Sequence, residues 1–161
     1  MADVANAELI PSASAGGNGH PGPDAHGDLY LEVLHFYARQ MQLLDDALVE
    51  EWAETFTEEG IFAANAQAQP TMGRKAIAAA ARATTDDLAR RGIRRRHWIG
   101  MPALTGTSGD GYRVRSYALV IETTVGGQSG VRMSTLMDDR LVRVEGRFLV
   151  DHRQVTRDDL P

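Results

Sequence analysis

The first half of the chain carries hydrophobic residues at helical spacing. Asp28 is suited to cap a helix, and the apolar side chains that follow recur at steps of three and four, at Tyr30, Val33, Leu34, Tyr37, Met41 and Leu44. Asp45 and Asp46 interrupt this pattern, and Asp46 is suited to cap a second helix with a stripe at Leu48, Trp52 and Phe56. The pattern therefore predicts two helices that form a hairpin.

A third helix is predicted over residues 74–91. This segment is rich in alanine, carries one apolar side and stops at Gly92, a residue type that commonly follows a helix. Between the second and third helices, residues 60–66 have no helical signal, and Pro70 and Gly73 flank a predicted turn or short strand.

The second half of the chain has the pattern of β-strands. Four segments, at about 93–104, 111–125, 130–145 and 147–156, are separated by short turns that contain glycine. Short links of this kind join consecutive antiparallel strands. We therefore predict the α+β class, with three N-terminal helices packed on one face of a curved, mostly antiparallel sheet.

Composition and charge narrow the class of protein. A chain of 161 residues with 43% hydrophobic residues fits one domain, over residues 28–161, whereas residues 1–27 lack any hydrophobic period and are predicted to form a disordered tail. The net charge of −5 argues against a nucleic-acid or anionic-lipid surface, and no apolar stretch is long enough for a membrane span. The absence of cysteine excludes disulfides and thiolate chemistry, and with no signal-peptide pattern we expect a cytoplasmic location.

Three sequence stretches carry a family resemblance. They are L-L-D-D-A-L-V-E-E-W-A-E-T-F-T-E-E-G-I-F from residue 43, G-R-K-A-I from residue 73 and R-H-W-I-G from residue 96. Together with the order of elements, they make residues 28–156 resemble the SnoaL-like branch of the NTF2-like superfamily. The resemblance implies a cone whose sheet curls around an apolar cavity. Members include polyketide cyclases, scytalone dehydratase, ketosteroid isomerase and structural β subunits of ring-hydroxylating dioxygenases, so the fold alone does not define one activity.

The resemblance transfers unevenly to individual residues. It makes His97 the counterpart of a pocket histidine in scytalone dehydratase, and Asp45 the counterpart of the aspartate that partners it. The second histidine of that enzyme corresponds to Glu122, its two tyrosines correspond to Leu44 and Ala64, and the base of ketosteroid isomerase also corresponds to Ala64. These departures disfavour both of those reactions in their known form.

Asp45 and His97 are the predicted catalytic pair. An aspartate that accepts a bond from one ring nitrogen fixes the histidine tautomer and leaves the other nitrogen to move a substrate proton. The alternatives are that His97 is a core histidine on an apolar strand face and that Asp45 only caps a helix.

Five further residues are candidates for substrate binding. Glu122 shares its face of a predicted strand with the small residues Ala118 and Val120. If that face is the inner one, Glu122 serves as a proton donor or second base. If the register is shifted by one residue, Glu122 is solvated. The others are Tyr37 and Tyr30 on the first helix, Met101 two residues beyond Ile99 on the face of His97, and Ser134. We expect no metal and no cofactor.

The resemblance implies an enzyme of secondary metabolism. The prediction is a cyclase or dehydratase that acts by acid–base catalysis, without a cofactor, on a hydrophobic aromatic polyketide-type intermediate, as in antibiotic biosynthesis. Two alternatives remain open, a non-catalytic protein that protects an unstable intermediate and a structural dioxygenase β-type subunit. The family also implies a homodimer formed through the sheet.

Overall fold

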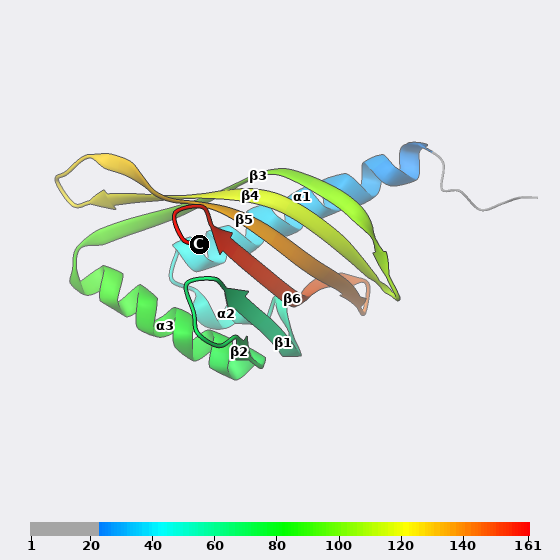
Figure 1. Ribbon diagram of the computed structural model, residues 1–161, viewed down its shortest axis with the longest axis horizontal. Helices are drawn as coiled ribbons and strands as arrows, with labels where there is room; N and C mark the ends of the chain where they lie inside the picture. Colours follow the sequence, from blue (N-terminus) through cyan, green and yellow to red (C-terminus); the bar gives the residue numbers. More distant parts are fainter. Residues whose placement is uncertain (1–22) are drawn as a thin grey trace, which may run out of the picture.

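Three helices precede most of the sheet in the computed structural model, which describes residues 23–161 (Figure 1). Residues 1–22 of the expected tail lie outside the described residues, and the first helix begins at Pro23 rather than at Asp28. The elements in chain order are α1 (Pro23–Asp45), α2 (Val49–Ala53), β1 (Phe56–Ala64), β2 (Thr71–Met72), α3 (Arg74–Arg90), β3 (Ile93–Ser108), β4 (Gly111–Thr124), β5 (Ser129–Val144) and β6 (Arg147–Arg157).

The strands form one curved sheet in the order β2-β1-β6-β5-β4-β3. Strands β3 to β6 are consecutive antiparallel neighbours, as the short glycine-containing turns predict, whereas β1 pairs with β6 in parallel. The α+β class with a mostly antiparallel sheet is thereby confirmed. Figure 1 shows α1 passing behind strands β3 to β5, with α2 and α3 below the left part of the sheet.

The second helix is much shorter than predicted. It ends at Ala53, and Phe56, which was expected on its apolar stripe, is the first residue of β1. Phe56 is nevertheless fully buried, and its ring packs edge-on against Trp52 with 5.0 Å between ring centroids. Leu48 takes the N-cap position of α2 without any side-chain capping bond, so the predicted capping role of Asp46 is wrong.

The core lies between the helices and the inner face of the sheet. Alternate residues of β4 are buried from Val114 through Ser116 and Ala118 to Val120, and Val114 belongs to the same core cluster as Val33 of α1. This alternation places Glu122 on the inner side of the sheet. Within residues 23–161, no helix combines the length and the apolar character needed to cross a membrane.

Strand β3 contains an irregularity that changes the direction of Met101. Gly100 pairs with Tyr117 and Ala103 pairs with Arg115, so that two residues of β3, Met101 and Pro102, lie opposite the single residue Ser116. Met101 has a φ of 53°, and 76% of its surface is exposed. The bulge therefore ends the alternation that begins at His97, and the expected inward direction of Met101 is wrong.

Candidate active site

Asp45 is the last residue of α1, and the chain turns sharply after it. The amide of Leu48 donates to the carbonyl of Leu43, and the amide of Ala47 donates to the carbonyl of Leu44, with Ala47 at a φ of 64°. These bonds define a Schellman motif that ends the helix. A carboxylate at this end opposes the helix dipole, so Asp45 is poorly explained by helix stability.

Both carboxylate oxygens of Asp45 bind His97 of β3. Oδ1 lies 2.6 Å from Nδ1 of the imidazole, and Oδ2 accepts a bond from the backbone amide of His97 at 3.0 Å. The side chains of His97 and Asp45 are 18% and 7% exposed. With Asp45 ionised, Nδ1 carries the ring hydrogen and Nε2 is the nitrogen left to accept a proton. The structure thus brings together the two residues of the predicted pair.

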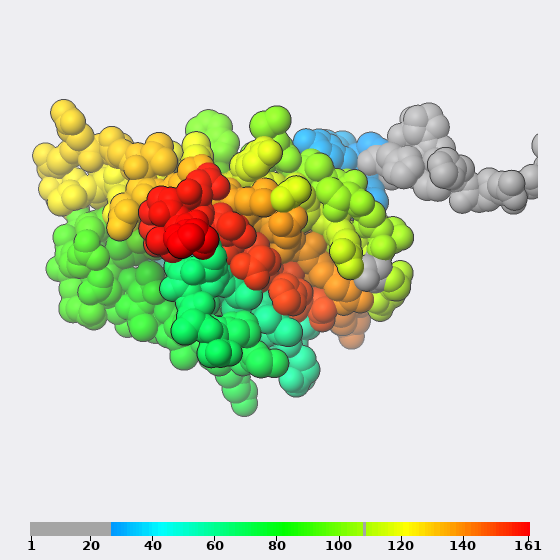
Figure 2. Space-filling model, viewed as in Figure 1, coloured from blue at the N-terminus to red at the C-terminus, as the bar shows by residue number. Residues whose placement is uncertain are grey.

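The pair borders a cavity of about 500 Å³ enclosed by the open end of the sheet, α2 and α3. Its wall is mainly apolar and includes Trp52, Phe62, Ile77 and Leu88. Figure 2 shows α3, in green, lying beneath the hairpin that joins β4 and β5, in yellow and orange, at this end of the molecule. A second groove, between α1 and the edge strand β3, reaches Asp45 and His97 from the other side.

Glu122 faces inward, but it is not a solitary carboxylic acid. Its Oε1 accepts bonds from Nε of Arg95 at 3.1 Å and from Nη2 at 2.5 Å, and the side chains of Arg95 and Glu122 are only 21% and 18% exposed. The inner-face alternative for Glu122 is confirmed. Its role as a proton donor or second base stays a prediction, and the structure adds that its carboxylate is paired with the guanidinium of Arg95.

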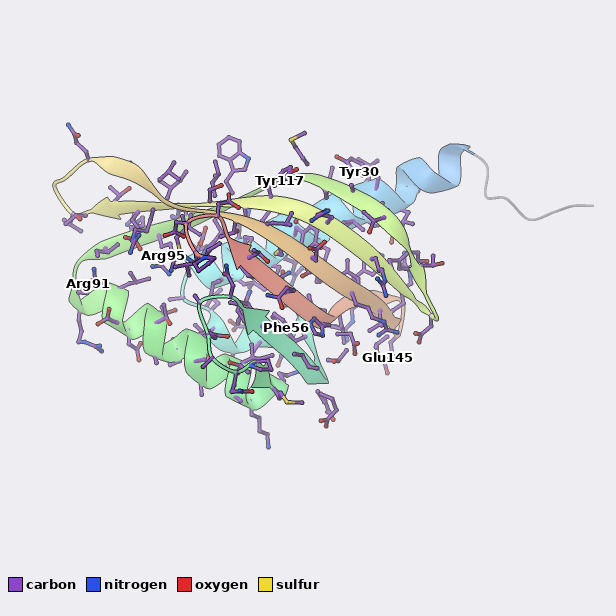
Figure 3. All side chains as sticks on the ribbon, viewed as in Figure 1. Tyr30, Phe56, Arg91, Arg95, Tyr117 and Glu145 are labelled. Atoms are coloured by element: carbon purple, nitrogen blue, oxygen red, sulfur yellow. The ribbon has the colours of Figure 1, made fainter. Side chains whose placement is uncertain are left out.

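Arg95 is the residue of this site that the sequence reasoning missed. It lies two positions before His97 on the same face of β3, directly opposite Glu122 in the sheet, and it borders the same cavity as His97. Figure 3 shows Arg95 on the side of the sheet that faces α3, whereas Tyr117 lies on the opposite side. The cross-strand pairing of Arg95 with Glu122 is the signal that would have identified it, but it requires the strand register.

Tyr37 is held in a buried polar network. Its hydroxyl donates to Asp139 at 3.0 Å, and the same carboxylate accepts from Arg153, which also donates to Gln40 at 2.7 Å. Burial, reinforced by the adjacent Asp139 carboxylate, raises the pKa of the Tyr37 phenol well above its usual value. The network fastens α1 to β5 and β6. Tyr37 also lines the second groove, which reaches His97, so its contact with a substrate stays a prediction.

Tyr30, Ser134 and Met101 do not join the site. Tyr30 lies fifteen residues before Asp45 in α1, about 22 Å along the helix axis, and its ring is partly exposed. Ser134 alternates with the buried Thr135, so it is exposed on the outer face, where its hydroxyl donates to Asp158 at 2.6 Å. The bulge in β3 turns Met101 outward.

No three histidine, aspartate or glutamate side chains among residues 23–161 are grouped closely enough to hold a metal ion.

Comparison with known proteins shows the family to which the chain belongs. The profile of the SnoaL-like domain matches residues 27–154, and the chain belongs to this family. ActVI-ORFA from Streptomyces coelicolor is 34% identical over 84% of this chain and 98% of that one, with a TM-score of 0.78. Aln2 from another Streptomyces species is 32% identical over 86% of this chain and 94% of that one, with a TM-score of 0.76.

A protein from Catenulispora acidiphila, whose structure contains S-DNPA, is also similar. It is 36% identical over 83% of this chain and 96% of that one, with a TM-score of 0.72. No curated protein matches the chain closely enough to count as a relative.

Proposed function

We propose that the protein is a cofactor-independent enzyme that removes a proton next to a carbonyl group of an aromatic polyketide-type intermediate and then closes a ring or eliminates water. The observation that carries this proposal is the Asp45–His97 pair at the wall of an apolar cavity. The resemblance to polyketide cyclases and dehydratases supports the substrate class. The complex of the Catenulispora acidiphila relative with S-DNPA supports the view that proteins of this family bind ligands.

His97 is the proposed general base. Its Nε2 takes a proton from the carbon next to the carbonyl, and the C–H electron pair forms the enolate while Asp45 stabilises the imidazolium. In ring closure, the enolate carbon attacks a second carbonyl, and the imidazolium returns its proton to the new alkoxide. In dehydration, the enolate expels a β-hydroxyl group, which leaves as water with the same proton. Both outcomes restore neutral His97.

The apolar wall supports this chemistry in three ways. It favours a flat, hydrophobic substrate over water, and it holds the reacting carbon near a fixed imidazole, which removes much of the entropic cost of reaction. The charge that develops on the enolate is also less screened in such a cavity than in solvent.

The test is exchange of the acidic α-protons of aromatic β-diketones for deuterium in D₂O, followed by proton NMR. His97→Gln is expected to slow the protein-catalysed exchange by about 10²–10⁴-fold. The matched control is His152→Gln, which changes a histidine in β6 that does not border the cavity. Wild-type exchange rates in His97→Gln would contradict the proposal, as would equal losses in both variants.

The two alternatives make different predictions. A protein that only protects an intermediate would bind diketones without accelerating their exchange, and His97→Gln and Asp45→Asn would leave product formation intact. A structural β-type subunit would co-purify with a larger catalytic chain when it is expressed with its neighbours, which a mass measurement by size exclusion would reveal.

We also propose a homodimer formed through the outer face of the sheet. Trp98, Tyr117, Leu119 and Val131 leave large apolar surfaces exposed on β3, β4 and β5, and Trp98 is 68% exposed. Exposed apolar patches of this kind commonly mark protein interfaces. Trp98→Glu is expected to give a monomer in a light-scattering mass measurement, whereas an unchanged mass would contradict this interface.

A further inference from the structure

Arg95 brings unused hydrogen-bond donors to the wall of the cavity beside His97. Of its five N–H groups, one on Nε and one on Nη2 bind Oε1 of Glu122. Within residues 23–161, no hydrogen bond or ion pair engages Nη1 of Arg95. Three N–H groups of this guanidinium thus have no protein acceptor, and because the side chain is 21% exposed and borders the cavity they are accessible to a ligand there.

Glu122 makes this donor group rigid. A long arginine side chain is normally mobile, but two bonds to one carboxylate fix the plane of the Arg95 guanidinium. Arg95 borders the cavity and Glu122 does not, so the substrate meets the positive partner of the pair. A group that accepts hydrogen bonds, or that becomes negative during the reaction, therefore fits this position.

The spacing relates Arg95 to the proposed proton transfer. Arg95 and His97 are alternate residues on one face of β3, so their Cα atoms are about 6.6 Å apart. A carbonyl oxygen and the carbon next to its carbonyl group are neighbouring parts of one substrate, so one substrate can meet both side chains. Donors aimed at the oxygen on which charge develops stabilise the transition state more than the bound substrate.

We infer that Arg95, oriented by Glu122, binds the carbonyl oxygen of the substrate and stabilises it as the enolate when His97 removes the neighbouring proton. This inference rests on the proposed function and names the half of the site that receives the negative charge. The substrate class it implies is a ketone or aromatic β-diketone with an acceptor oxygen one carbon from the acidic proton. Arg95 is then a catalytic residue, and Glu122 is a positioning residue.

The test uses 2-naphthol, an aromatic probe whose ionised form resembles an enolate. Its absorption spectrum distinguishes the neutral and ionised forms, so titrations across pH give the dissociation constant of each. The wild-type protein is expected to bind naphtholate more tightly than naphthol. Arg95→Met is expected to reduce this preference by about ten-fold or more, the effect of losing a hydrogen bond to a charged group.

Three control variants separate Arg95 from its surroundings. Arg94→Met removes a neighbouring positive charge that also borders the cavity, His97→Gln removes the proposed base, and Glu122→Gln removes the orienting charge but keeps the guanidinium. Arg94→Met and His97→Gln are each expected to keep the wild-type preference for naphtholate. Glu122→Gln, which no longer fixes the guanidinium, is expected to weaken the preference without abolishing it. Arg95→Met/Glu122→Gln avoids leaving Glu122 unpaired, and it is expected to lose the preference while circular dichroism shows an intact fold.

The binding assay tests the role of Arg95, and the exchange assay tests the proposed catalysis by His97, so the two can fail independently. A naphtholate preference that survives in the folded double variant would overturn the role of Arg95, whatever the result of the exchange assay. Equal affinity of the wild-type protein for both forms would also overturn it. If diketone exchange is absent but the preference depends on Arg95, the oxygen-binding role stands and the proposed catalysis by His97 fails. If exchange is present, Arg95→Met is expected to lower kcat more than it raises KM.

Discussion

Replacing Asp45 by asparagine tests the catalytic pair with almost no change in shape. In the wild-type protein, Oδ1 and Oδ2 of Asp45 both face donors, the ring Nδ1–H and the backbone N–H of His97. Asparagine supplies one acceptor and one donor. The backbone amide cannot reverse its role, so the asparagine oxygen must accept from it and the asparagine NH₂ group must face Nδ1. Nδ1 then becomes the acceptor, and the ring hydrogen moves to Nε2.

The consequence is a histidine with the wrong nitrogen protonated. The substitution removes a charge-assisted hydrogen bond worth about 1.5–3 kcal/mol and leaves no basic lone pair at Nε2. We expect the diketone exchange rate to fall by about 10²–10⁴-fold, close to the effect of removing the base itself. Because the side chains have the same shape, unfolding in urea should show a smaller change than a deletion to alanine.

The assay is two-dimensional ¹H–¹⁵N NMR of the imidazole, which distinguishes the two tautomers without any substrate. Wild-type His97 is expected to show the Nδ1–H form, and Asp45→Asn the Nε2–H form. Asp46→Asn is the matched control, because Asp46 is a neighbouring, largely exposed aspartate whose ion-pair partner is Arg96 at 3.5 Å. An Asp45→Asn protein with the wild-type tautomer and the wild-type exchange rate would show that Asp45 neither sets the tautomer of His97 nor supports proton transfer.

Three further predictions concern the structure that supports the site. Asp139→Asn leaves Arg153, whose side chain is 3% exposed, without its charged partner, so urea unfolding should show a loss of about 3–5 kcal/mol. Tyr37→Phe, which removes only one hydrogen bond of the same network, should lose less, and equal losses in the two variants would contradict a buried ion pair. The raised pKa of Tyr37 keeps its phenol protonated in the folded state, whereas the unfolded phenol ionises near pH 10. Above pH 10, the free energy of unfolding of the wild-type protein should therefore fall more steeply than that of Tyr37→Phe, by about 1.4 kcal/mol per pH unit. Parallel curves for the two proteins would contradict this prediction. Ala47→Gly should raise the free energy of unfolding by about 0.5–1 kcal/mol, since glycine adopts a φ of 64° without strain, and a loss of stability would argue against the left-handed turn after Asp45.

The long antiparallel strands could be predicted because their signals are local. Glycine-containing turns separate β3 to β6, and α3 combines an alanine-rich sequence with an end next to Gly92. Strand β1 has no such local signal, because it is defined by parallel pairing with β6, about ninety residues later in the chain. The same pairing explains why Phe56 belongs to a strand although its spacing from Trp52 fits a helix.

The candidate site also contains features that could be predicted from the sequence and features that could not. The meeting of Asp45 and His97 could be predicted from the family resemblance, and the inner-face alternative for Glu122 from alternation with Ala118 and Val120. The ion pair of Glu122 with Arg95 could not, because it depends on the register of two strands. Met101 points outward because of a β-bulge, which the alternation of side chains along a strand does not predict.

Chemical rescue of His97→Ala is the decisive experiment on the proposed base. In the proposed mechanism, the imidazole held by Asp45 removes the substrate proton. His97→Ala is therefore expected to lose diketone exchange, and imidazole added to the buffer is expected to restore the exchange with saturation, but not in Asp45→Asn/His97→Ala. Exchange at the wild-type rate in His97→Ala without imidazole would contradict this mechanism, as would a stimulation by imidazole no greater than in the absence of protein.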